Sequence, residues 1–122
     1  MARNPFLSSF GFAVEGIRHA MTTQRNMKVH GATALLVIIA ATVLGVGPTQ
    51  WMFLLLAITL VLIAEMFNTA IEAVVDLVSL DIHPLAKAAK DIAAGAVFIT
   101  VAFAVIVGII IFYRPIVELL GG

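Results

Sequence analysis

The sequence predicts an all-α membrane protein with an N-terminal amphipathic surface helix and three transmembrane helices. The first observation is composition, because 62% of the 122 residues are apolar and 11% are charged, whereas about a quarter of the residues in a soluble domain are charged. The second is three long apolar segments separated by breaks that contain glycine or proline. A chain of this length has room for one small bundle, so we expect a single integral membrane domain over residues 1–122.

Charge and cysteine content exclude several classes of function. The formal net charge is zero, so we expect no binding of nucleic acid. The chain contains no cysteine, which excludes disulfides, thiolate catalysis and thiolate metal sites. The N-terminus lacks the unbroken apolar core and the small-residue cleavage site of a signal peptide, so we expect no cleaved signal.

The first expected element is an N-terminal helix that begins at Asn4-Pro5, since asparagine is a good N-cap and proline is tolerated at the first helical position. Its apolar residues recur at helical spacing, with polar residues mostly displaced from them. Such a helix is typical of one that lies along the membrane surface, and the alternative is that it packs against the bundle. The apolar stripe consists of Phe6, Phe10, Ala13, Val14, Ile17 and Met21.

Three membrane-spanning helices follow. The first is expected over residues 31–47, about 26 Å of helix, with an extension back to residue 26. The second is expected from about residue 50 to about residue 80, and the third from about residue 85 to residue 113. A turn at residues 45–48 and a break at residues 81–84 separate them, because both contain proline.

The basic residues predict the orientation. Six of the seven lie on one side of a three-span arrangement, and the positive-inside tendency makes that side cytoplasmic. The N-terminus is therefore expected in the cytoplasm. The six are Arg3, Arg18, Arg25, Lys28, Lys87 and Lys90, and the seventh is Arg114.

The most informative feature is a set of polar residues inside the second apolar segment, namely Glu65, Asn68, Glu72 and Asp76. An ionised carboxylate at mid-bilayer costs about 2.5–3.5 kcal/mol on insertion scales, so such residues usually have a partner or a function. At 100° per residue the three carboxylates fall within about 40° of one another, with the amide about 60° to one side. One face of this helix therefore carries a row of oxygen atoms, which we call the acidic face.

The polar residues at the cytoplasmic end suit phosphoryl transfer. Carboxylate and amide oxygens without thiolates fit Mg²⁺, which takes one or two protein carboxylates and completes its shell with water and phosphate. Lysine and arginine can hold phosphate charge, and a buried carboxylate can act as general base toward a lipid alcohol. Composition and spacing alone do not distinguish this chemistry from a proton relay or an ion path. The chain contains no P-loop and no protein-kinase motif.

Specific motifs resemble the prokaryotic diacylglycerol kinase family, which includes the undecaprenol kinases of Gram-positive bacteria. The central one is Glu65-x-x-Asn68-Thr-Ala-Ile-Glu72-Ala-Val-Val-Asp76, followed by His83 and by Ala-Lys90-Asp91-x-Ala-Ala-Gly95. The segment Arg25-Asn26-Met-Lys-Val-His30 resembles the undecaprenol kinase branch in particular. The resemblance extends from about residue 10 to residue 107.

The resemblance implies a homotrimeric lipid kinase of the bacterial cytoplasmic membrane, with active sites shared between subunits. MgATP binds on the cytoplasmic side and the lipid alcohol, diacylglycerol or undecaprenol, enters from the bilayer. By the same resemblance Glu65 is the catalytic base and Glu72 a metal ligand, while Asn68 and Asp76 support the site. His83 matches the position of a residue in the family's loop, and Lys90 with Asp91 contacts or organises the nucleotide phosphates.

One position departs from the family pattern. The family usually carries a second metal-binding carboxylate before the first span, in a Glu-x-Asn arrangement, whereas this chain has Gln24-Arg-Asn26. An amide oxygen at Gln24 can bind Mg²⁺ but adds no charge.

Two other functions are alternatives to a lipid kinase. One is a small oligomeric proton or cation conductor lined by the acidic face, and the other is a regulatory or holin-like membrane subunit without catalysis.

Overall fold

The computed structural model describes residues 4–122, which form four α-helices joined by short connections. They are α1 (Pro5–Thr23), α2 (Arg25–Leu44), α3 (Pro48–Val78) and α4 (Pro84–Leu119). By length and composition α2, α3 and α4 can each cross a membrane. The all-helical class is therefore confirmed, and so are three helices long and apolar enough to span a membrane. Arg3, one of the basic residues used to predict the orientation, lies outside the described residues.

Proline and a side-chain cap mark the helix starts. Asn4 Oδ1 accepts a hydrogen bond from the Phe6 N–H at 3.0 Å, which confirms the predicted start of α1. At the start of α4, His83 Nδ1 accepts from the Leu85 N–H at 3.1 Å. In α1, α3 and α4 a proline occupies the first turn, where its missing N–H leaves no intrahelical bond unmade.

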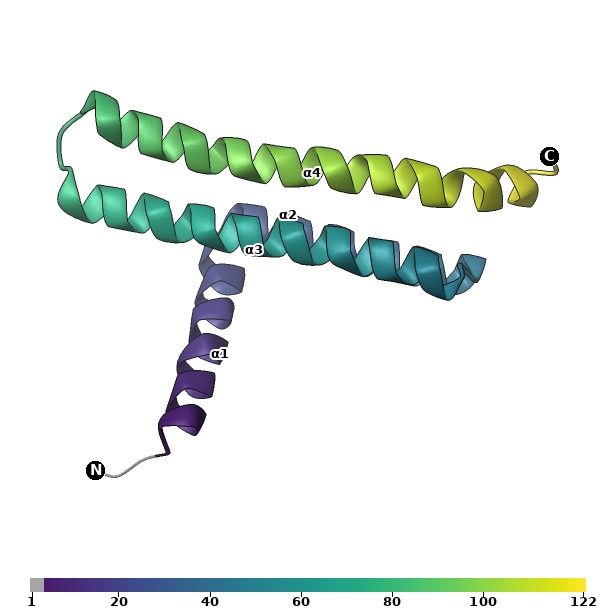
Figure 1. Cartoon of the computed structure of the whole chain (residues 1–122), viewed down its shortest axis with the longest axis horizontal. Coiled ribbons are helices and arrows are strands. Elements are labelled where there is room, and N and C mark those ends of the chain that lie inside the picture. The colour runs from purple at the N-terminus through teal and green to yellow at the C-terminus, as the bar shows by residue number, and fades with distance from the viewer. Residues whose placement is uncertain (1–3) are drawn as a thin grey trace.

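The bundle is an antiparallel hairpin of α3 and α4 with α2 packed beside α3 (Figure 1). Its apolar core at the end near the α2–α3 turn contains Ala41, Leu54, Ala57 and Val107. In Figure 1 the α3–α4 hairpin continues well beyond the corner where α1 meets α2. Polar residues in the last part of α3 therefore lie past the start of the first span.

Helix α1 leaves the bundle at a steep angle instead of lying along it (Figure 1). Ala20 is its one buried residue, and the aromatic residues of its apolar stripe, Phe6 and Phe10, are exposed. Within a single chain α1 therefore does not pack along the bundle. At the α1–α2 corner Met27 is fully buried, which anchors the corner to the bundle.

The last helix is longer than the sequence analysis predicted. We expected the third span to end near Tyr113, but α4 continues through Pro115 to Leu119. Proline removes one backbone hydrogen bond, but its fixed φ is compatible with a helix, so α4 can continue past it at that cost. Beyond the proline the regular pattern resumes, with the Leu120 N–H donating to the Ile116 carbonyl at 3.0 Å.

The turn between α2 and α3 depends on a glycine in the left-handed region. Gly45 caps α2 with a φ of 67°, a conformation that costs roughly 1–2 kcal/mol for a residue with a Cβ.

We expect Gly45→Ala to lower the free energy of unfolding by about 1 kcal/mol, measured by denaturant unfolding in detergent. Gly11→Ala is the control, because Gly11 is helical with open space around it, and an equal loss there would remove the conformational explanation.

Candidate active site on helix α3

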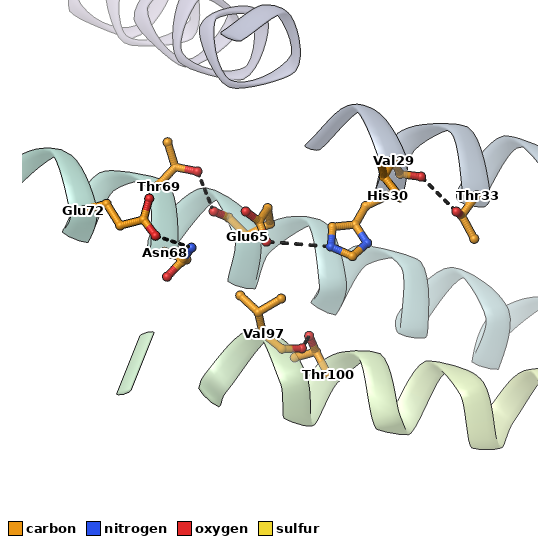
Figure 2. Close-up of polar contacts among 9 residues, drawn as sticks. All are labelled: Val29, His30, Thr33, Glu65, Asn68, Thr69, Glu72, Val97 and Thr100. Carbon is orange, nitrogen blue, oxygen red and sulfur yellow. Dashed lines mark hydrogen bonds and ion pairs between the residues drawn. The ribbon is translucent and has the colours of Figure 1, made fainter. Parts of the chain in front are cut away.

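Glu65 lies at the centre of the site and is 2% exposed. Its Oε2 is buried without a hydrogen bond among the described residues, and His30 Nε2 on α2 lies 3.7 Å away (Figure 2). Its backbone carbonyl accepts a hydrogen bond from Thr69 Oγ1 at 2.9 Å. A carboxylate buried without a full set of partners is costly. Such a group is available to accept a proton from a substrate.

Asn68 and Glu72 form the next part of the acidic face. Asn68 Nδ2 donates to Glu72 Oε1 at 3.3 Å (Figure 2). Asn68 is 6% exposed, and its Oδ1 is buried without a hydrogen-bond partner in the part of the chain that the structure describes. Glu72 is half-buried. The predicted grouping of carboxylate and amide on one helix face is thus present, with one amide oxygen still free to bind a ligand.

Two ion pairs lie at the far end of the hairpin, and one of them joins its two helices. Lys90 Nζ lies 2.6 Å from Asp76 Oδ1, which links α4 to α3. Lys87 Nζ lies 2.5 Å from Asp91 Oδ2 within α4. The adjacent Lys90 and Asp91 therefore have different partners, and Lys87, to which the sequence suggested only a role in topology, is paired with a predicted site residue.

A cavity of about 330 Å³ opens at this end of the hairpin. It contains acidic, basic and imidazole side chains from both helices and from the loop between them. An open cavity that carries both signs of charge suits a solvated polyanion that arrives with a cation. Its polar lining consists of Asp76, Ser79, Asp81, His83, Lys87, Lys90 and Asp91.

Two predicted site residues occupy structural positions at helix ends. His83 caps α4 through Nδ1, so Nε2 is the ring nitrogen that is not used by the cap. Gln24 lies half-buried at the corner between α1 and α2, where its backbone N–H donates to the Ala20 carbonyl at 3.0 Å. Its side chain makes no capping hydrogen bond to α2.

The donor set fits a hard cation that brings most of its own ligands. Residues 4–122 contain no cluster of three His, Cys, Asp or Glu side chains that holds a metal alone. The Glu72 carboxylate and the unpartnered Asn68 Oδ1 are adjacent oxygen donors one helical turn apart. Mg²⁺ is commonly bound by one or two carboxylates, with water and substrate phosphates completing the octahedron. The residues present therefore suit metal that arrives with a nucleotide.

An apolar groove of about 500 Å³ runs between the helices, and its lining residues on α3 precede Glu65 in the chain. It extends from His30 on α2, past Val61 on α3, to Phe112 and Ile116 on α4. His30 is one of its few polar lining residues. The groove thus meets the acidic face where His30 approaches Glu65.

Comparison with known proteins identifies the family. Residues 11–112 match the prokaryotic diacylglycerol kinase family. The chain belongs to this family. An undecaprenol kinase from Bacillus subtilis (strain 168) is 42% identical over 109 residues, which cover 89% of each chain. A diacylglycerol kinase from Synechocystis is 44% identical over 115 residues, which cover 93% of this chain and 66% of that protein. A diacylglycerol kinase from Escherichia coli (strain K12) is 34% identical over 100 residues, 82% of each chain.

Membership in this family confirms the resemblance seen in the sequence motifs. The protein is a membrane-embedded lipid kinase, with ATP as the phosphoryl donor. The matched residues include the whole acidic face, all of α3, and α4 as far as residue 112. The two rivals, a proton or cation conductor and a non-catalytic subunit, are not favoured by the family.

Sequence reasoning did not include His30 among the site residues. Its importance depends on how α2 packs against α3, since the contact joins residues 35 positions apart. The sequence offered one signal, the match of Arg25-Asn26-x-x-x-His30 to the undecaprenol kinase branch, which suggested a distinctive residue without giving it a role.

Proposed function

We propose that this chain transfers the γ-phosphoryl group of MgATP to the terminal hydroxyl of a membrane lipid alcohol, with Glu65 as the general base. The observation that carries the proposal is the position of Glu65, which is buried on α3 beside His30 of the apolar groove and about 15 Å of helix before the polar cavity begins at Val75. In this proposal the lipid hydroxyl reaches the carboxylate from the groove, and the triphosphate extends toward it from the polar cavity along the acidic face.

The proposed reaction begins when Glu65 accepts the proton of the lipid hydroxyl. The alcohol oxygen then forms a bond to the γ-phosphorus, and the bond from that phosphorus to the β–γ bridging oxygen breaks, which releases ADP. Glu72, Asn68 and Gln24 would hold Mg²⁺ that arrives with ATP, and the cation would supply positive charge to offset that of the phosphates. Positioning and charge neutralisation supply most of the catalysis in such reactions.

The other predicted residues take supporting positions in this proposal. Glu72 and Asn68 contribute oxygen ligands to Mg²⁺, and Gln24 adds an amide oxygen from the α1–α2 corner. Asp76 holds Lys90 at the edge of the polar cavity, where the ammonium group contacts phosphate. His83 and Asp91 line the same cavity and contact or organise the nucleotide.

Topology and assembly form part of the same proposal. We place α1 along the inner surface of the bacterial cytoplasmic membrane, because it leaves the bundle steeply and exposes its aromatic residues. The N-terminus and the α3–α4 loop then lie in the cytoplasm, where ATP is available. We also propose a homotrimer with shared sites. Supporting it, one chain alone leaves Glu72 half-buried and brings together no complete metal site among the described residues.

The acceptor is proposed to be undecaprenol, with diacylglycerol as the second candidate. The relative from Bacillus subtilis is named an undecaprenol kinase, and it aligns with 89% of this chain. The test is transfer of radiolabelled phosphate from MgATP to each alcohol in the same detergent micelles. Greater incorporation into undecaprenol supports the assignment, greater incorporation into diacylglycerol reverses it, and no incorporation into either by folded protein refutes the kinase.

Lys90 provides a direct test of the polar cavity. A charge-assisted hydrogen bond contributes about 1.5–3 kcal/mol, so we expect Lys90→Ala to raise the KM for MgATP about tenfold or more. Stability changes little, because an exposed ion pair contributes about 0–1 kcal/mol. The matched control is Arg114→Ala, which removes a basic side chain near the opposite end of α4, away from the polar cavity. Equal KM values for the two variants would contradict the contact between Lys90 and phosphate.

Replacing the amide of Gln24 with a carboxylate is expected to increase the affinity for Mg²⁺. Gln24→Glu adds a negative charge where the family usually has a metal-binding carboxylate. We expect the Mg²⁺ concentration for half-maximal rate to fall several-fold, since a charged oxygen binds Mg²⁺ more strongly than a neutral one. A titration of activity with Mg²⁺ at fixed ATP measures this midpoint concentration. An unchanged midpoint would show that residue 24 does not bind metal.

A further inference from the structure

We infer that His30 is a positioning residue for the Glu65 carboxylate and forms the polar end of the groove that receives the lipid alcohol. The inference rests on the proposed role of Glu65 as base. It assigns to α2 a part in the chemistry, through a contact that joins the first span to the acidic face (Figure 2).

The geometry around Oε2 of Glu65 carries the inference. This oxygen is buried and accepts no hydrogen bond among the described residues, and the one basic side chain within 4 Å is the imidazole of His30, at 3.7 Å. That distance is longer than a hydrogen bond, yet catalytic contacts are often long before substrate binds and shorten in the reactive complex. A small movement of the ring brings Nε2 within hydrogen-bond distance of the carboxylate.

The contact distinguishes the two oxygens of the base. When Nε2 donates to Oε2, that oxygen is held, and Oε1 is left to accept the proton of the alcohol. A base whose orientation is fixed in this way loses less freedom when the reaction begins. Without a donor at residue 30 the carboxylate can rotate, and the orientation that accepts the proton is populated less often.

The apolar groove gives the contact its second function. The groove is lined by Val61, Phe112 and Ile116 along its length and by His30 at one end. A hydrocarbon chain in this groove faces mostly apolar side chains. Thr33 and Tyr113 also line it, and the Thr33 hydroxyl donates to the Val29 carbonyl of its own helix. His30 is the lining residue that approaches Glu65, so a lipid hydroxyl that stops at the imidazole lies beside the base.

The kinetic test compares a variant that keeps the donor with one that removes it. His30→Gln retains an N–H donor, whereas His30→Leu fills similar space without one. We expect His30→Leu to lower kcat about tenfold or more with the KM for MgATP changed less than twofold, and His30→Gln to recover most of kcat. Two results would overturn the inference: wild-type kcat in the leucine variant, or equal losses in both variants.

A spectroscopic test is independent of activity. In protein labelled with ¹⁵N at histidine, we expect Glu65→Gln to shift the Nε2 resonance of His30, while His19 and His83 remain unchanged. An unchanged His30 resonance would refute the contact even if the wild-type protein is an active kinase. A shifted His30 resonance in a protein that phosphorylates no lipid alcohol would instead support the contact and refute the proposed function.

Discussion

Glu65→Gln is expected to abolish phosphoryl transfer and to leave the protein folded. General-base catalysis contributes about 10²–10⁴-fold to rate, so we expect kcat to fall at least about 100-fold while the KM for MgATP changes little. The neutral amide keeps the volume of the side chain and removes an unpaired buried charge, so stability is maintained or increased. Radiolabel transfer and thermal unfolding in the same detergent measure both effects.

The control for this variant is Glu118→Gln, which neutralises a carboxylate near the opposite end of α4. Its kcat should match the wild-type value. Glu65→Asp adds a second comparison, because it keeps a carboxylate but withdraws it by one methylene, and we expect partial activity. Full activity of Glu65→Gln would contradict the assignment of the base.

Glu72→Gln is expected to weaken metal binding and not to remove the base. Loss of a charged ligand should raise the Mg²⁺ concentration for half-maximal rate at least about tenfold. Mutation of residues that only hydrogen-bond to a metal ligand typically lowers metal affinity or activity about 10–100-fold. High Mg²⁺ should recover much of the rate, whereas it should not rescue Glu65→Gln. Activity titrated with Mg²⁺ at fixed ATP distinguishes these two responses.

Asn68→Asp is the matched test on the adjacent ligand. It keeps an oxygen at the position of the unpartnered Oδ1 and adds charge next to Glu72. If both residues bind the metal, this variant should require less Mg²⁺ than Glu72→Gln does. Identical Mg²⁺ titrations for wild type and Glu72→Gln would show that the carboxylate does not bind metal.

Much of the fold followed from local chemistry that the sequence displays. Asn4-Pro5 starts a helix because the asparagine side chain accepts a hydrogen bond from the first turn and proline has no N–H that needs a partner. Gly45 ends a helix because glycine can adopt the positive φ of the cap. The continuation of α4 through Pro115 was not predictable from the same rules. A proline inside a helix removes a hydrogen bond and usually ends or kinks the helix, so the sequence favoured an end near Tyr113, whereas the structure continues the helix at that cost.

The acidic face was predictable because helical periodicity alone aligns Glu65, Asn68 and Glu72. Contacts between helices were not. The approach of His30 to Glu65 depends on the packing of α2 against α3, and the pairing of Lys90 with Asp76 depends on the hairpin. Adjacent residues suggested that Lys90 acts together with Asp91, yet the turn of α4 directs each toward a different partner.

The most direct test of the central claim is the position of the metal nucleotide. Mn²⁺ takes the same kinds of oxygen ligand as Mg²⁺, and its unpaired electrons broaden nearby NMR signals. With ATP and Mn²⁺ added to methyl-labelled protein, we predict strong broadening of the methyl signals of Thr69 and Ala73, which lie close to Glu72 on α3. We predict no broadening for Ala41 and Thr42, which lie near the C-terminal end of α2, far from the acidic face. Broadening at Ala41 and Thr42 with sharp signals at Thr69 and Ala73 would contradict the account.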